Sequence, residues 1–203
     1  MQRHVSVLKR VILWFRRLPY RRGYGIHSPW AFSFVTGVIY ERGEFYAYEA
    51  LRRQRGSGAT SEKDDRLLLR LANAFQPSRA IVWGGESVGE PLRYMKAGRS
   101  ACEYRHLHPG DGGQMEDVLK EWGSVDMLYV DDASAWRDVV EAALPYVHAH
   151  TCVIIRNVGG ADGGVWQEVI ADSRVRLSFD LYYLGILCFD PRFAKQDYVI
   201  NYV

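Results

Sequence analysis

Two patterns of apolar and polar positions alternate along the chain. Apolar residues spaced three and four apart predict helices, and short runs of apolar residues predict strands. Apolar residues spaced three and four apart predict a helix over residues 67–75, which Pro77 ends. The other helices are predicted at residues 90–95, 114–122, 135–144 and 166–170. Short apolar runs predict strands at residues 80–83, 100–104, 125–130, 151–155, 175–183, 184–189 and 198–202, with the sixth joined tightly to the fifth at Gly185.

This order predicts an α/β fold with a doubly wound, mostly parallel sheet of about seven strands. Apolar strands that alternate with amphipathic helices are typical of a sheet covered on both faces. The two strands without a helix between them predict an antiparallel C-terminal hairpin. In such a sheet, ligands bind beyond the carboxyl ends of the strands. The loops of interest are therefore residues 84–91, 104–109, 131–134 and 156–164.

A helical N-terminal arm precedes this core. Val5, Leu8, Ile12 and Phe15 form one apolar stripe on a helix, and the first 22 residues carry seven basic side chains and no acid. One interpretation is a helix that lies on an anionic membrane or on nucleic acid, and the other is a helix packed on its own core. A second helix is predicted from Pro29 to residue 40, because serine at position 28 is a good N-cap.

Charge divides the chain at about residue 60. Residues 1–60 hold 11 Lys/Arg and 3 Asp/Glu, whereas residues 61–203 hold 15 and 21. The net charge of +2 therefore conceals +8 in the first segment and −6 in the second. Residues 55–60 read as a flexible connection. We predict two units, a basic helical arm over residues 1–60 and an α/β core over residues 61–203.

Composition excludes several classes of protein. Hydrophobic residues make up 48% and charged residues 25%, which is enough apolar surface to order a globular chain. No apolar run reaches the length of a membrane-spanning helix. The three cysteines are far apart and odd in number, so we expect no disulfide framework and a cytoplasmic protein, with peripheral membrane association left open.

Several segments, taken together, resemble the class I S-adenosylmethionine-dependent methyltransferases, in particular a bacterial O-methyltransferase-like branch. They are the stretch Gly-Ile-His-Ser-Pro-Trp at residues 25–30, the helix at 67–75 before the first strand, the loop Gly-Glu-Ser-Val-Gly at 85–89, the strand ending at Asp131, Trp166, and the closing residues 180–186. The resemblance covers most of the chain and implies a Rossmann-like fold with S-adenosylmethionine as cofactor.

The resemblance also implies roles for individual residues. Gly85, Glu86, Ser87 and Gly89 would contact the cofactor from the loop, and Glu103 and Asp131 would contact it from the following strands. The base that accepts a proton from the methyl acceptor would be Asp131 or His106.

Three positions depart from the family pattern. The first strand normally ends in an acid, but here the position holds Trp83, whose indole accepts no hydrogen bond. The family also has an acid at the end of the second strand, and that position here holds His106, with Glu103 a few residues earlier. Metal-dependent relatives hold a cation with an acid after one strand and an Asp-Asn pair after the next strand along the chain. Asp131 and Asn157 match this set, but Arg156 takes the place of the aspartate of the pair. Because a guanidinium cannot ligate a metal, we predict no metal site and expect Arg156 to pair with an acid or bind an anionic substrate.

These observations leave two functions open. The first is a methyltransferase acting on a small-molecule acceptor. The second is a degenerate member of the fold that serves as a binding or scaffold module, with residues 1–22 contacting a membrane or nucleic acid. A homodimer is a further expectation, since the basic helix and the edge of the closing hairpin both offer contact surfaces.

Overall fold

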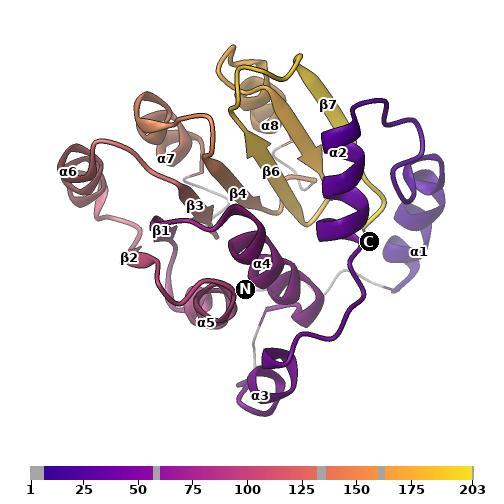
Figure 1. The fold of residues 1–203 in the computed structure, drawn as a ribbon, viewed down its shortest axis with the longest axis horizontal. Coiled ribbons are helices and arrows are strands. Elements are labelled where there is room, and N and C mark those ends of the chain that lie inside the picture. The colour runs from indigo at the N-terminus through magenta and orange to yellow at the C-terminus, as the bar shows by residue number, and fades with distance from the viewer. Residues whose placement is uncertain (1–6, 57–59, 132–135, 160–162, 203) are drawn as a thin grey trace.

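The computed structural model describes residues 7–56, 60–131, 136–159 and 163–202. In these residues the chain forms eight α-helices and seven strands (Figure 1). Val5, residues 57–59 of the predicted connection at 55–60, part of the loop after Asp131 and part of the glycine-rich loop at 159–164 lie outside the described residues. The division into an arm and a core at residue 60 stays a prediction.

The strands form one sheet in the order β2-β1-β3-β4-β6-β5-β7. Only β6 runs against its neighbours, so the sheet is mostly parallel and ends in an antiparallel hairpin. The predicted fold class is confirmed. The strand bounds are β1 Arg79–Trp83, β2 Glu103–Leu107, β3 Met127–Val130, β4 Cys152–Arg156, β5 Leu177–Asp180, β6 Leu184–Cys188 and β7 Gln196–Val199.

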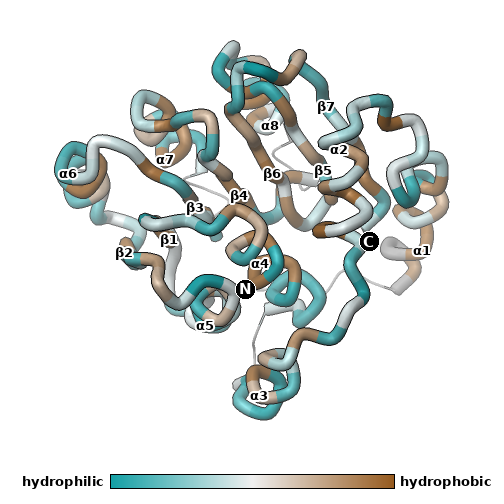
Figure 2. Tube along the Cα trace, viewed as in Figure 1, coloured by the Kyte–Doolittle hydropathy of each residue, from teal (hydrophilic) through white to brown (hydrophobic). Residues whose placement is uncertain are grey.

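Helices cover both faces of the sheet. One buried apolar cluster joins the sheet to α2, the turn after it, α4 and α5, and the other joins it to α6, α7 and α8. Figure 2 shows β4 and β6 as hydrophobic strands between these layers. The helix bounds are α1 Val7–Arg16, α2 Pro29–Phe34, α3 Ala47–Arg53, α4 Glu62–Phe75, α5 Gly89–Gly98, α6 Gly112–Trp122, α7 Trp136–Ala143 and α8 Gly163–Ala171.

Several predicted strand boundaries are wrong. The fifth strand spans Leu177–Asp180 instead of residues 175–183, and the last strand spans Gln196–Val199 instead of residues 198–202. The second strand occupies Glu103–Leu107 instead of residues 100–104. It lies at the edge of the sheet, where its side chains are largely half-buried or exposed, so it lacks the apolar run that marks an inner strand. The hairpin turns at residues 181–183, and Gly185 lies inside β6, where an added Cβ would come within 2.5 Å of the Trp166 ring. The glycine therefore allows α8 to pack closely on the sheet.

The arm helix α1 leaves several apolar side chains exposed. Leu8, Ile12 and Phe15, which belong to the predicted apolar stripe, are 69%, 49% and 62% exposed. Arg17, just beyond the helix, donates to the Asp180 carboxylate at 2.8 Å. The apolar stripe of the helix therefore faces solvent, whereas Leu13 and Trp14 are half-buried.

The C-terminal residues join the arm to the core. The Asn201 side-chain amide donates to the Trp14 carbonyl at 3.1 Å, and the Asn201 backbone N–H donates to the Tyr20 carbonyl at 3.1 Å. The Tyr40 hydroxyl donates to the Asn201 carbonyl. Segments from the two ends of the sequence thus lie side by side. No helix within the described ranges is long and apolar enough to cross a membrane.

Candidate active site

The sheet reverses its order between β1 and β3. The chain runs from β1 outward to β2 and then returns across β1 to β3, so the crevice at the carboxyl ends of β1 and β3 is a topological switch point. Two backbone hydrogen bonds fix the residues that follow these strands. Gly84 N–H donates to the Leu107 carbonyl at 3.0 Å, and Asp131 N–H donates to the Trp83 carbonyl at 2.9 Å. The glycine loop and Asp131 therefore meet where such folds bind ligands.

Asp131 is the centre of a hydrogen-bonded group of side chains. Its carboxylate is 5% exposed and accepts from the Tyr129 hydroxyl at 2.8 Å and from the Arg156 guanidinium at 2.6 Å. The Ser87 hydroxyl donates to its second oxygen. We call these four residues the Asp131 cluster. Three donors and one positive charge satisfy the carboxylate within the protein itself.

Strand geometry explains the membership of this cluster. Tyr129 and Asp131 are two positions apart, so both side chains leave the same face of the strand. Arg156 ends β4, which pairs with β3 in a register that sets Val130 beside Ile155. Burial raises the pKa of Tyr129 well above its usual value, and the neighbouring Asp131 charge adds to the effect. The phenol therefore stays a proton donor to the carboxylate.

Arg156 keeps its charge in this setting. Burial lowers the pKa of Arg156, but the nearby Tyr129 and Asp131 outweigh that effect, and the pKa is raised overall. The predicted pairing of Arg156 with an acid is what the structure shows, with Asp131 as the partner. The described part of the chain brings no three His, Cys, Asp or Glu side chains together as metal ligands.

The glycine loop has one crowded and two open positions. A Cβ on Gly84 would meet Val88 Cγ1 at 2.5 Å and Asp131 Cβ at 2.9 Å, so packing requires glycine there. A Cβ on Gly85 or Gly89 would meet nothing within 4 Å. These two predicted contact residues border open space that a ligand can enter. The requirement at Gly84 was missed, although two consecutive glycines after a strand were its signal.

The remaining predicted loop residues divide between solvent and the cluster. The Glu86 side chain is exposed at the start of a short 3-10 turn, Glu86–Val88. Its neighbour Ser87 turns to Asp131 instead. The loop therefore leaves the Glu86 carboxylate exposed, while the Ser87 hydroxyl is already engaged by Asp131.

The two predicted residues of β2 lie at opposite ends of the strand. His106 is near the carboxyl end, and its Nε2 lies 2.9 Å from the Gly84 carbonyl oxygen, so it borders the crevice. Glu103 begins the strand and stands opposite Arg79, the first residue of β1. Its carboxylate accepts from Arg105 at 3.0 Å. Glu103 is therefore remote from the glycine loop and does not join the other predicted residues.

Trp83 occupies the end of β1. The residue is 4% exposed, and its indole Nε1 has no hydrogen-bond partner among the described residues. A large apolar ring thus replaces the acid that the family pattern places at this position. The ring packs in the cluster that joins the sheet to α6, α7 and α8.

Solved structures share this arrangement of strands and helices. An O-methyltransferase from Bacillus cereus in complex with SAH is 15% identical, with a TM-score of 0.52, and the match covers 77% of this chain and 96% of that chain. The fold is that of a class I S-adenosylmethionine-dependent methyltransferase.

Two further methyltransferase structures have the same fold. An SAH-bound methyltransferase from Podospora anserina is 12% identical over 80% of this chain and 96% of that chain, with a TM-score of 0.51. A Streptomyces achromogenes O-methyltransferase of tomaymycin synthesis, in complex with SAM, is 18% identical over 72% and 91%, with a TM-score of 0.50. No protein-family model and no curated protein matches the sequence.

Proposed function

We propose that this protein is an S-adenosylmethionine-dependent methyltransferase that acts on a small-molecule acceptor. The observation that carries the proposal is the convergence of an open glycine loop and Asp131 at the switch point of a methyltransferase fold. The cofactor-bound neighbours share this fold over most of the chain. The same crevice offers the open backbone that an extended, polar cofactor needs for close approach.

The loop would hold the cofactor with a reduced set of contacts. Gly85 and Gly89 border open space, and the exposed Glu86 carboxylate can accept a hydrogen bond from an ammonium group. Glu103 is left out of the proposed site because it lies at the other end of β2. With no acid at the end of β2, we expect a cofactor affinity below that of enzymes that hold both ribose hydroxyls through a carboxylate.

When bound, the cofactor supplies a methyl group on a sulfonium centre. The chain's own residues then position the acceptor oxygen and handle its proton. Asp131 is the proposed base, and its carboxylate would exchange the Ser87 hydroxyl for the acceptor hydroxyl, because Ser87 is on an exposed loop whereas Tyr129 and Arg156 are fixed by the sheet. The second proposed base, His106, would first have to release the Gly84 carbonyl.

A second candidate function is a binding or scaffold module. It is favoured by the residues that replace acids of the family pattern. Arg156 already neutralises Asp131, Trp83 stands at the end of β1, and His106 at the end of β2. Trp83 and His106 stand where the resemblance implies acids that contact the cofactor, and Arg156 stands where it implies a metal-binding aspartate. The exposed apolar residues of α1 favour a membrane surface as the partner of such a module.

Calorimetric titration of the full chain with S-adenosylmethionine separates the two functions. We expect saturable binding, at least tenfold weaker in Gly85→Val, because the new side chain would fill the open space beside the loop. Gly113→Val is the matched control, since its Cβ also meets nothing within 4 Å but lies at the start of α6. Absence of heat at millimolar cofactor would overturn the methyltransferase proposal and leave the binding module.

A further inference from the structure

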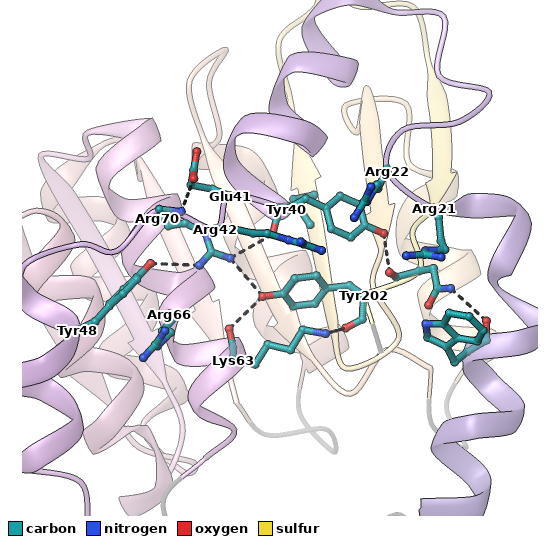
Figure 3. Close-up of a pocket in the computed structure, with 14 residues that line it drawn as sticks. Arg21, Arg22, Tyr40, Glu41, Arg42, Tyr48, Lys63, Arg66, Arg70 and Tyr202 are labelled. Carbon is teal, nitrogen blue, oxygen red and sulfur yellow. Dashed lines mark hydrogen bonds between the residues drawn. The ribbon is translucent and has the colours of Figure 1, made fainter.

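A cavity of about 320 Å³ lies between the arm, α4 and the C-terminal residues (Figure 3). One wall is formed by Tyr48 of α3 and by arm residues Trp14, Arg21, Arg22 and 39–43. Lys63, Arg66 and Arg70 of α4, spaced three and four apart, form a second wall, and Asn201 and Tyr202 close the cavity. We call it the arm pocket. It shares no lining residue with the Asp131 cluster.

The lining of the arm pocket is strongly cationic. Among the described lining residues, six are basic and only Glu41 is acidic. Aromatic rings hold three of the cations at short distances from ring centres: Arg66 over Tyr48 at 4.5 Å, Lys63 over Tyr202 at 4.0 Å and Arg21 over Trp14 at 5.3 Å. A ring face orients a cation without cancelling its charge. Arg66 is also paired with Glu62 at 2.8 Å and with Glu44 at 3.7 Å, so its charge is balanced within the chain. The lining as a whole still holds more basic than acidic side chains.

Arg70 is a buried cation whose hydrogen-bond acceptors are all neutral. It is 7% exposed, and its guanidinium donates to the carbonyls of Val38 and Ile39 and to the hydroxyls of Tyr48 and Tyr202. All four acceptors are neutral, and no carboxylate pairs with Arg70 among the described residues. A buried cation without an anion is costly unless an anion is supplied. A bound anion in the arm pocket would supply it.

Asn201 contributes a buried hydrogen-bond acceptor that needs a donor. The residue is 5% exposed, and its side-chain nitrogen donates to the Trp14 carbonyl, which fixes the orientation of the amide. The Asn201 side-chain oxygen has no hydrogen-bond partner within the described part of the chain. Such a buried acceptor is rare in folded proteins and is satisfied by a donor. A ligand of the arm pocket should therefore carry a hydroxyl or N–H group as well as a negative charge.

We infer that the arm pocket binds a small phosphate monoester that carries a hydroxyl group, such as a short sugar or polyol phosphate. A phosphate monoester has close to two negative charges and three strong acceptor oxygens, which suit arginine forks. The volume lies at the small end of the range for small-molecule sites. The inference does not rest on the proposed methyltransferase function, because it uses none of the residues of the crevice.

Calorimetry of the full chain without S-adenosylmethionine tests the inference. We expect glycerol 3-phosphate to bind, ethyl phosphate to bind about tenfold more weakly because it offers no donor to Asn201, and inorganic sulfate to bind weakly or not at all. Arg42→Ala should weaken glycerol 3-phosphate about tenfold, since Arg42 lines the pocket and is exposed enough to be replaced without unfolding. Arg52→Ala, an exposed arginine of α3 outside the lining, is the matched control.

Three outcomes would overturn the inference. One is no binding of any phosphate at millimolar concentration by a protein with an unchanged melting temperature. Another is an equal loss of affinity in Arg42→Ala and Arg52→Ala, which would indicate general surface charge. The third is a short DNA duplex that binds and depends on Arg42 while glycerol 3-phosphate does not bind, which would assign the surface to nucleic acid.

Discussion

The two charged regions of this protein differ in how their charges are satisfied. In the Asp131 cluster, a carboxylate and a guanidinium lie 2.6 Å apart, and two hydroxyls complete the carboxylate's hydrogen bonds. In the arm pocket, Arg66 is paired with Glu62 and Glu44, but the buried Arg70 guanidinium contacts only neutral oxygens among the described residues. Charge that is paired within the chain serves the fold, whereas charge held without a counter-ion is available to a ligand. The methyltransferase fold places its crevice at the first region, but the stronger unsatisfied charge is at the second.

Asp64 lies between the two regions. It follows Lys63 of the arm pocket on α4, and its charge interacts with both Lys63 and Arg156. Removing the Asp64 charge should therefore change the electrostatic potential at both regions. A substitution at Asp64 can test whether the two regions are coupled.

The largest expected effect on stability follows from removing one partner of the buried Arg156–Asp131 ion pair. Arg156→Met leaves Asp131 buried without its cation, and we expect the free energy of unfolding to fall by about 3–5 kcal/mol. Urea denaturation measures the change. The double variant with Asp131→Asn should recover much of the loss, because no unpaired charge then remains. A loss below about 1 kcal/mol in the single variant would show that water reaches the pair and that the cluster is more open than described.

Asp64 gives the next effect, which depends on pH. Burial raises the pKa of Asp64 from 3.8 to about 6, an effect that the neighbouring Asp65 reinforces and that Lys63, Arg156 and a Ser61 hydrogen bond reduce. The folded protein holds a proton that the unfolded chain has already lost in this window. The contribution of Asp64 to stability is therefore full below about pH 4 and falls by an amount on the order of 3 kcal/mol as the pH rises to about 6.

Denaturation curves at pH 4 and pH 7 for the wild-type protein and Asp64→Asn check this sign. The asparagine variant should lose less stability over the interval, so its advantage over the wild-type protein should appear at pH 7 and vanish at pH 4. Equal pH dependence in the two proteins would contradict the raised pKa. An increased affinity for glycerol 3-phosphate in the variant would show that the two regions are electrically coupled.

A smaller effect is expected from Gly84→Ala in the crevice. The added Cβ would collide with Val88 and Asp131, so we expect a loss of about 1–3 kcal/mol together with a displaced glycine loop. Gly85→Ala, one residue later, meets open space and should change stability by less than about 0.5 kcal/mol. Thermal melts of the two variants provide the comparison. Equal melting temperatures would show that the loop adapts easily around Gly84.

The smallest effect on stability is expected on α1. Phe15→Ser replaces an exposed side chain and should change the free energy of unfolding by less than about 0.5 kcal/mol. If the α1 stripe contacts membranes, the same variant should bind anionic vesicles several-fold more weakly in a co-sedimentation assay. It is a better test than deleting residues 1–22, because deletion would also remove Arg17 and its bonds to the core. Unchanged vesicle binding would discard the membrane surface as partner.

Much of the fold could be predicted from the sequence because inner strands have unbroken apolar runs. The edge strand β2 has no such run, and its predicted position was three residues early. The same error explains Glu103, which was expected near the crevice and lies at the far end of the strand. Apolar runs in a sequence indicate buried strands. A strand at the edge of the sheet is less buried, so it has no such run and its position is harder to predict.

Part of the Asp131 cluster could also be predicted from the spacing of residues in the sequence. The alternation of Tyr129 and Asp131 along β3 was sufficient to predict that their side chains share a face. The arm pocket, in contrast, had no local signal, since it joins Trp14, Arg70 and Asn201 from three distant parts of the chain. Only tertiary packing brings these residues together.

The hydrogen bond between Asn201 and Trp14 also determines when the structure can be completed. It spans 187 positions in the sequence. At a synthesis rate of about 5–20 residues per second, Trp14 is made roughly 10 to 40 seconds before its partner. The arm remains without this neighbour for that interval, so this contact cannot form until position 201 has been made.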